Sequence, residues 1–134
     1  MVPFSISHCP LRETMNKKIL VVDDESDILK EVSFILQKKG FTVYTGVNGQ
    51  EAIDLAEKFK PDLIILDVFM PCVSGSEAGR VIKQREDLKD IPIILLTASI
   101  DNIDAKKTEC MADDYIFKPF DYQELLKKIE KLIK

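Results

Sequence analysis

The sequence has 134 residues, of which 46% are hydrophobic and 31% charged, and its formal net charge is −4 at pH 7. This length suits one domain that buries a core without disulfides or a structural metal, and the composition excludes a disordered chain. Apolar runs such as Ile91 to Leu96 are too short to cross a bilayer, and Met1 to Pro10 does not resemble a secretory signal. We therefore expect a cytoplasmic protein with no membrane segment, and the acidic balance predicts no direct binding to nucleic acid.

The three cysteines, Cys9, Cys72 and Cys110, are widely spaced and form no CxxC pair. This pattern favours reduced, unpaired thiols over a disulfide framework or a zinc site. The only histidine, His8, lies in the N-terminal tail. Histidine-based catalysis within the folded part is therefore excluded.

From Lys17 onward, short apolar runs rich in β-branched residues alternate with amphipathic stretches. We predict an α/β fold, an open and doubly wound (βα)₅ sheet of five parallel strands. Three of the strands are continuously apolar, as expected where helices cover both faces of a parallel sheet. The predicted strands are Lys18–Val22, Thr42–Thr45, Leu63–Leu66, Ile91–Leu96 and Tyr115–Phe117.

Three of the predicted helices begin at typical N-cap residues, each followed three places later by a glutamate that suits the first turn. Gly40 is placed to end the first helix in a left-handed turn. Apolar residues at helical spacing predict that the first and last helices each bury one stripe against the sheet. The cap pairs are Asn48 with Glu51, Ser74 with Glu77, and Asp121 with Glu124. The stripes are Ile28, Val32, Ile35 and Leu36 in the first helix, and Leu125, Ile129, Leu132 and Ile133 in the last.

Polar residues follow four of the predicted strands. Asp23 and Asp24 follow the first strand, Asp67 the third, Thr97 the fourth and Lys118 the fifth. Because the carboxyl ends of parallel strands meet at one edge of a sheet, these side chains are expected to share a pocket. Clustered carboxylates repel one another, and either protonation of one of them or a bound Mg²⁺ relieves the repulsion. With a hydroxyl and an ammonium opposite a metal, the set suits phosphoryl transfer onto an aspartate.

Three of these residues also have a purely structural interpretation. Asp24 alone suits a helix cap, and Thr97 alone suits a turn. Lys118 alone suits a loop position before Pro119, where extended backbone is favoured. Their joint placement on separate strand ends is what favours a shared site, with Asp67 on the central strand as the acceptor.

Four motifs of the sequence resemble the response regulator receiver family, and the resemblance covers about Lys17 to Lys134. The motifs are VVDDE (Val21–Glu25), LDVFMPCVSG (Leu66–Gly75), LLTA (Leu95–Ala98) and DDYIFKPF (Asp113–Phe120). The resemblance implies a flavodoxin-like fold with strand order 2-1-3-4-5, similar to a single-domain chemotaxis regulator. It also implies a phosphorylation switch of a two-component system, with an N-terminal extension over residues 1–16 and a receiver domain over residues 17–134.

The resemblance further implies a Mg²⁺ site. Asp67 would be the phosphorylated residue and a ligand of the metal, together with Asp24 and the backbone carbonyl of Phe69. Asp23 would hold the metal through a water molecule. Phe69 departs from the family pattern, where a smaller or polar residue is frequent, and Met111 stands where glycine is frequent. We hypothesise that Phe69 shields the acyl phosphate from water.

The remaining implied roles concern the phosphoryl group and the switch. Thr97 would bond a phosphoryl oxygen, and Lys118 would pair with the phosphoryl group. The Lys118–Pro119 bond is cis in such proteins. On phosphorylation Thr97 would move inward and Tyr115 would follow it. Without that role, Tyr115 is an aromatic strand residue that packs against a helix.

The implied donor is another molecule, either a histidine kinase or a histidine phosphotransfer protein, because His8 is the only histidine. The domain would promote its own phosphorylation and dephosphorylation rather than act as an enzyme on other molecules. It would signal to a downstream protein through helix four, strand five and helix five, as a monomer or a phosphorylation-dependent homodimer. Either the receiver stands alone or the natural chain is longer.

Two other functions remain open at this point. One is a protein-binding module that keeps the receiver fold without being phosphorylated. The other is a phosphatase of the haloacid-dehalogenase type, which would need its nucleophile on the first strand and usually a cap domain. Asp67 on the third strand disfavours the phosphatase.

Overall fold

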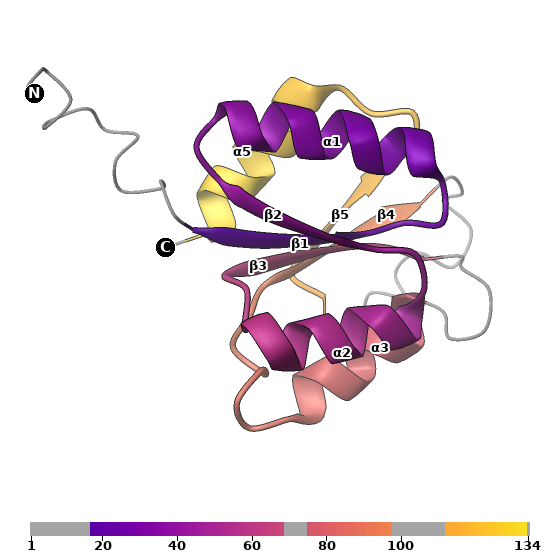
Figure 1. Cartoon of the computed structure of the whole chain (residues 1–134), viewed down its shortest axis with the longest axis vertical. Coiled ribbons are helices and arrows are strands. Elements are labelled where there is room, and N and C mark those ends of the chain that lie inside the picture. The colour runs from indigo at the N-terminus through magenta and orange to yellow at the C-terminus, as the bar shows by residue number, and fades with distance from the viewer. Residues whose placement is uncertain (1–16, 69–74, 98–111, 134) are drawn as a thin grey trace, which may run out of the picture.

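The computed structural model describes residues 17–68, 75–97 and 112–133. Five parallel strands form one sheet in the order β2-β1-β3-β4-β5 (Figure 1). The strands are β1 (Lys18–Val22), β2 (Thr42–Gly46), β3 (Leu63–Asp67), β4 (Ile93–Thr97) and β5 (Asp114–Phe117). The helices of the described residues are α1 (Ser26–Lys38), α2 (Gly49–Phe59), α3 (Gly75–Gln84) and α5 (Tyr122–Leu132). The predicted doubly wound parallel sheet with strand order 2-1-3-4-5 is confirmed. Helix four, expected between β4 and β5, falls outside the described residues.

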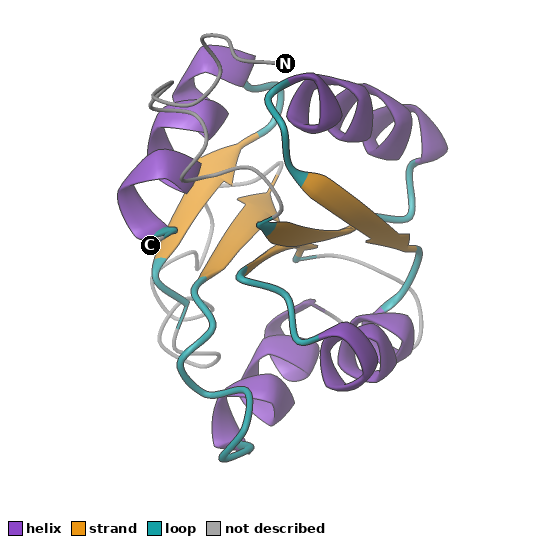
Figure 2. Ribbon diagram, turned by 60° about the vertical axis from the view of Figure 1, so that its left-hand side comes forward, coloured by secondary structure: helices purple, strands orange, loops and turns teal. Residues whose placement is uncertain are grey.

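The two faces of the sheet are covered by different pairs of helices. α1 and α5 pack on one face and α2 and α3 on the other, as Figure 1 and Figure 2 show from two directions. β3 and β4 are buried at every position, in accord with their continuously apolar sequences. No helix in the described part of the chain is long and apolar enough to cross a membrane.

Four strand predictions agree with the structure to within one residue at each end, and the fourth strand differs more. β4 begins at Ile93 rather than at Ile91, and it ends at Thr97. The backbone N–H of Ile91 donates to the carbonyl of Leu88 at 3.1 Å, in the turn that follows α3. Pro92 has no N–H to donate. These two residues are therefore used in the connection before the strand begins.

α1 buries two of the four predicted stripe residues, Val32 and Leu36. Leu29, Val32 and Leu36 are buried, whereas Ile28 and Ile35 are only partly covered. Positions 29, 32 and 36 are separated by three and four residues, so they lie along one face of a helix that begins at Ser26. In α5 the prediction holds better, with Leu125, Ile129 and Ile133 buried and Leu132 half-buried.

The predicted helix ends are confirmed where the structure describes them. The Asn48 side chain accepts a hydrogen bond from the Glu51 N–H at 2.9 Å, and Asp121 accepts one from Gln123 N–H at 2.9 Å. The Glu51 carboxylate in turn accepts from the Val47 N–H at 2.8 Å. Gly40 has a φ of 98°, in the left-handed region. The proposed cap at Ser74 lies outside the described residues.

We expect Asn48→Ala to lower the free energy of unfolding by about 1 kcal/mol, because it removes the acceptor that satisfies the first turn of α2. Urea denaturation measures this loss. Gln50→Ala, in the same turn, removes only an exposed side chain that donates to Asp54, and it should change the free energy by less than about 0.5 kcal/mol. Equal losses in the two variants would show that the cap contributes nothing of its own.

Candidate functional site

The strand-end residues come together at one edge of the sheet, as the parallel arrangement requires. Asp23 directly follows β1, Asp67 ends β3, Thr97 ends β4 and Lys118 directly follows β5. Asp23, Asp67 and Thr97 are 0%, 5% and 1% exposed, and among the described residues they are the buried polar or charged side chains. Burial of carboxylates costs free energy unless they are paired, so their concentration at one edge marks a candidate functional site.

Lys118 lies between three carboxylates. Its Nζ is 2.8 Å from Oδ2 of Asp23, 3.0 Å from Oε1 of Glu25 and 3.4 Å from Oδ2 of Asp67. Burial by itself lowers the pKa of Lys118, but the contacts with Asp23, Glu25 and Asp67 outweigh it and raise the pKa above its ordinary value of 10.5. The ammonium is therefore charged throughout the physiological range of pH.

The acidic residues after β1 form a cluster that could hold a cation. Carboxylate oxygens of Asp23, Asp24 and Glu25 all lie within 4.8 Å of one another. Oδ1 of Asp23 accepts the Glu25 N–H at 2.9 Å, and the buried Oδ2 of Asp23 faces the Lys118 ammonium at 2.8 Å. Asp24 and Glu25 are exposed. A set of carboxylate oxygens open to solvent on one side suits a hard divalent cation that keeps some of its water.

Thr97 and Lys118 are joined through the backbone. The N–H of Lys118 donates to the carbonyl of Thr97 at 2.7 Å, and the Lys118–Pro119 bond is cis, as the resemblance implied. This hydrogen bond continues the pairing of β4 with β5, in which Thr97 lies opposite Phe117. The expected hydroxyl and ammonium are thus held at neighbouring strand ends.

Tyr115 is half-buried and packs against the core between the sheet and the α2–α3 layer. Its ring makes an edge contact with Phe117 at 5.2 Å between centroids. Tyr115 lies opposite Leu95, two residues before Thr97 on the neighbouring strand. Since side chains alternate along a strand, Tyr115 and Thr97 belong to the same face of the sheet.

The structure adds Glu25 to the site and leaves other predicted members outside the described residues. The motif VVDDE contained Glu25, but nothing in its sequence position showed that it reaches Lys118, which is 93 residues away. The Phe69 carbonyl, Met111 and the N-terminal extension over residues 1–16 all lie outside the described residues.

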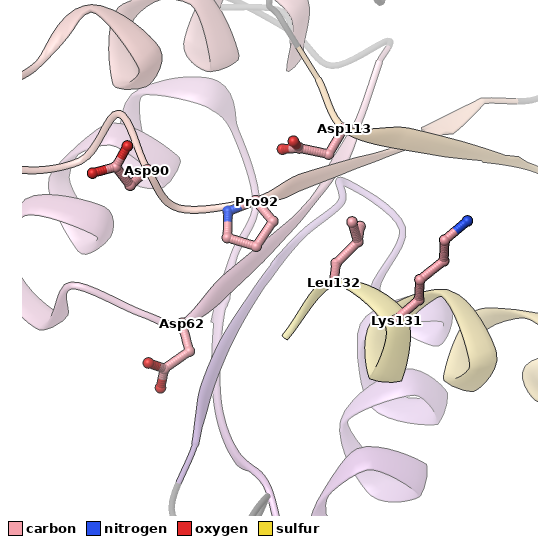
Figure 3. Close-up of a pocket in the computed structure, with 6 residues that line it drawn as sticks. All are labelled: Asp62, Asp90, Pro92, Asp113, Lys131 and Leu132. Atoms are coloured by element: carbon pink, nitrogen blue, oxygen red, sulfur yellow. The ribbon is translucent and has the colours of Figure 1, made fainter. Parts of the chain in front are cut away.

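A cavity of about 460 Å³ lies at the opposite edge of the sheet (Figure 3). Two of its carboxylates are engaged in the fold, because Asp62 accepts the Lys18 N–H at 2.8 Å and Asp113 accepts the Ile93 N–H at 2.9 Å. These bonds link the beginnings of neighbouring strands. Its lining residues are Asp62, Asp90, Pro92, Asp113, Lys131 and Leu132.

The chain is similar to known signalling proteins. A model of the response regulator receiver domain matches residues 19–130. The alkaline phosphatase synthesis transcriptional regulatory protein PhoP of Bacillus subtilis is 40% identical over 121 residues, which make up 90% of this chain and 50% of PhoP. The response regulator TrrA of Thermotoga maritima, solved in complex with Mg²⁺-BeF, is 40% identical, with a TM-score of 0.79 over 87% of this chain and 99% of that chain. The chemotaxis protein CheY4 of Vibrio cholerae is 33% identical, with a TM-score of 0.83 over 88% and 99%.

This chain belongs to the response regulator receiver domain family. Its class of function is that of a phosphoacceptor in two-component signal transduction. The chain spans half the length of PhoP, so the comparison with PhoP covers that protein only in part.

Proposed function

We propose that Asp67 receives the phosphoryl group and that a phosphohistidine of a histidine kinase or a histidine phosphotransfer protein donates it. The observation that carries this proposal is the Lys118 ammonium, 3.4 Å from Oδ2 of Asp67 at the buried end of β3. In the reaction one carboxylate oxygen of Asp67 forms the new O–P bond. The N–P bond of the donor histidine breaks, and its electron pair stays on the imidazole nitrogen.

Lys118 and Thr97 would then stabilise the charged phosphoryl oxygens, the first as an ion pair and the second as a hydroxyl donor. The same groups would promote both phosphorylation and later hydrolysis, so the domain would set its own phosphoryl lifetime. Movement of Thr97 toward the new group would vacate space for Tyr115, which packs on the same face of the sheet. The face formed by helix four, β5 and α5 would carry this change to a downstream protein, either as a monomer or through a phosphorylation-dependent homodimer.

Mg²⁺ is the cofactor that these residues fit. Asp24, Asp67 and the backbone carbonyl of Phe69 would be its ligands, with Asp23 holding it through water. The carboxylate oxygens of Asp23, Asp24 and Glu25, clustered within 4.8 Å of one another, support this assignment. When bound, the ion supplies positive charge opposite the transferring phosphoryl oxygens. TrrA, solved in complex with Mg²⁺-BeF, provides a precedent among similar proteins.

The proposal is tested by intact-mass analysis after incubation with acetyl phosphate. We expect one phosphoryl adduct in the presence of Mg²⁺ and none when EDTA removes the metal, because the carboxylate cluster repels an anionic donor unless a cation offsets its charge. Circular dichroism in both buffers controls for loss of the fold. Folded protein that takes no phosphoryl group with Mg²⁺ present would favour the phosphorylation-independent binding module instead.

A further inference from the structure

Glu25 is an N-cap residue whose side chain does not cap its helix. It occupies the N-cap position of α1 with extended backbone, yet it makes no side-chain hydrogen bond to the first turn. The equivalent residues of α2 and α5, Asn48 and Asp121, both accept a backbone N–H. Oε1 of Glu25 instead accepts a hydrogen bond from Nζ of Lys118 at 3.0 Å. The side chain is thus committed to the site rather than to the helix.

Lys118 lies closer to Asp23 and Glu25 than to Asp67, at 2.8 and 3.0 Å against 3.4 Å. An ammonium has three N–H donors, and a phosphoryl group on Asp67 would offer it further charged oxygens. The donor that faces Asp67 can turn to the phosphoryl group, but a second bond to that group requires Lys118 to release Asp23 or Glu25.

Glu25 is the contact that costs least to release. Its side chain is 61% exposed, so water can replace the ammonium around its carboxylate. The Asp23 side chain is fully buried, and its other oxygen already accepts the Glu25 N–H. A buried carboxylate that loses its cation suffers a much larger penalty than an exposed one.

We propose that Glu25 is a positioning residue that holds Lys118 toward the solvent-exposed side of the site and competes with the phosphoryl group for Lys118. This inference rests on the proposed function of Asp67 and deepens it. Glu25 lowers the affinity of the site for a phosphoryl group, because its contact with Lys118 has to be given up before Lys118 can make a second bond to the group. The residue after the aspartate pair thereby tunes how readily the switch is turned on.

The first test concerns the lysine alone and needs neither Mg²⁺ nor phosphate. In Glu25→Gln, an uncharged acylating reagent that reacts with amines should modify Lys118 about two- to fivefold faster than in the wild type. This is the range expected for loss of a partly exposed ion pair. Peptide mass spectrometry quantifies the modification. Asp27→Asn is the matched control, because Asp27 lies in the first turn of α1 and its substitution removes the same charge. Equal acylation rates at Lys118 in wild type, Glu25→Gln and Asp27→Asn would overturn the proposed positioning of Lys118 by Glu25.

The second test measures affinity for beryllofluoride, a phosphoryl analogue, by 15N–1H NMR titration at a Mg²⁺ concentration that saturates each variant. Glu25→Gln should bind about two- to fivefold more tightly and Asp27→Asn should match wild type. Glu25→Asp, which keeps the charge but is one methylene shorter, should resemble Glu25→Gln. In a Lys118→Met background the gain from Glu25→Gln should disappear, as competition for that lysine requires.

The outcomes of the second test separate the two proposals. Unchanged or weaker binding by Glu25→Gln, or a gain that persists without Lys118, would overturn the competition while leaving Asp67 as the acceptor. Failure of the wild type to bind beryllofluoride, together with failure to form the acetyl phosphate adduct, would overturn the proposed function and the competition with it. Faster acylation of Lys118 in Glu25→Gln would then still support the positioning of Lys118 by Glu25.

Discussion

Replacing Asp67 with asparagine is expected to abolish the phosphoryl adduct that acetyl phosphate and Mg²⁺ give with the wild type. An amide offers no carboxylate oxygen to form the O–P bond, and the described strand ends carry no serine or cysteine that could replace it. The side chain keeps its size, so the fold should survive. Removing one of the three carboxylates around Lys118 also relieves repulsion, and stability should change little. Intact-mass analysis gives the adduct and urea denaturation gives the stability.

The matched control for this prediction is Asp90→Asn. Asp90 is an exposed carboxylate beside the cavity at the opposite edge of the sheet. Its variant should take up one phosphoryl group as the wild type does. An adduct that persists in Asp67→Asn would place the acceptor elsewhere, and peptide mapping would then identify it.

Lys118→Met is expected to lower the free energy of unfolding by about 3 kcal/mol at pH 7, measured by urea denaturation without Mg²⁺. The variant leaves the fully buried Asp23 and the nearly buried Asp67 without their common cation. The sign with pH follows from the raised pKa of Lys118. The stabilisation is fully present below the ordinary lysine pKa of 10.5 and is lost only as pH rises through the raised value.

Lys60→Met controls for the loss of a lysine from an ion pair. Lys60 pairs with Asp87 at 3.0 Å, but both side chains are more than half exposed, and such a pair contributes less than about 1 kcal/mol. Added Mg²⁺ should restore part of the stability of Lys118→Met, since a bound cation supplies the missing charge. Equal losses in the two variants would mean that burial adds nothing to the Lys118 contacts.

The sheet was predictable because its signals are local and repeated. Continuously apolar strands such as Leu63–Leu66 occur only where both faces are covered, and the parallel arrangement then brings Asp23, Asp67, Thr97 and Lys118 to one edge. The start of β4 was missed because apolar character alone does not reveal that Ile91 bonds back to Leu88.

Two errors in the prediction concern side-chain direction. Val32 and Leu36 of α1 are buried as predicted, but Leu29 was missed because Ile28 and Leu29 are equally apolar, and the angle at which the helix lies on the sheet decides which one is buried. Glu25 was given no role because its partner, Lys118, lies 93 residues away on another strand end. Pairing between distant side chains depends on tertiary packing, which a motif does not encode.

The two edges of the sheet carry carboxylates with different partners. At the amino-terminal edge, Asp62 and Asp113 fasten neighbouring strands by accepting backbone N–H groups. The carboxyl-terminal edge carries Asp23, Asp24, Glu25 and Asp67, whose negative charges repel one another. Five-residue strands separate the two edges by roughly 15 Å, beyond the range in which substitutions usually couple. Changes that strengthen the first edge can therefore be combined with changes in switching behaviour at the second, so this domain can be stabilised for engineering without resetting its signalling response.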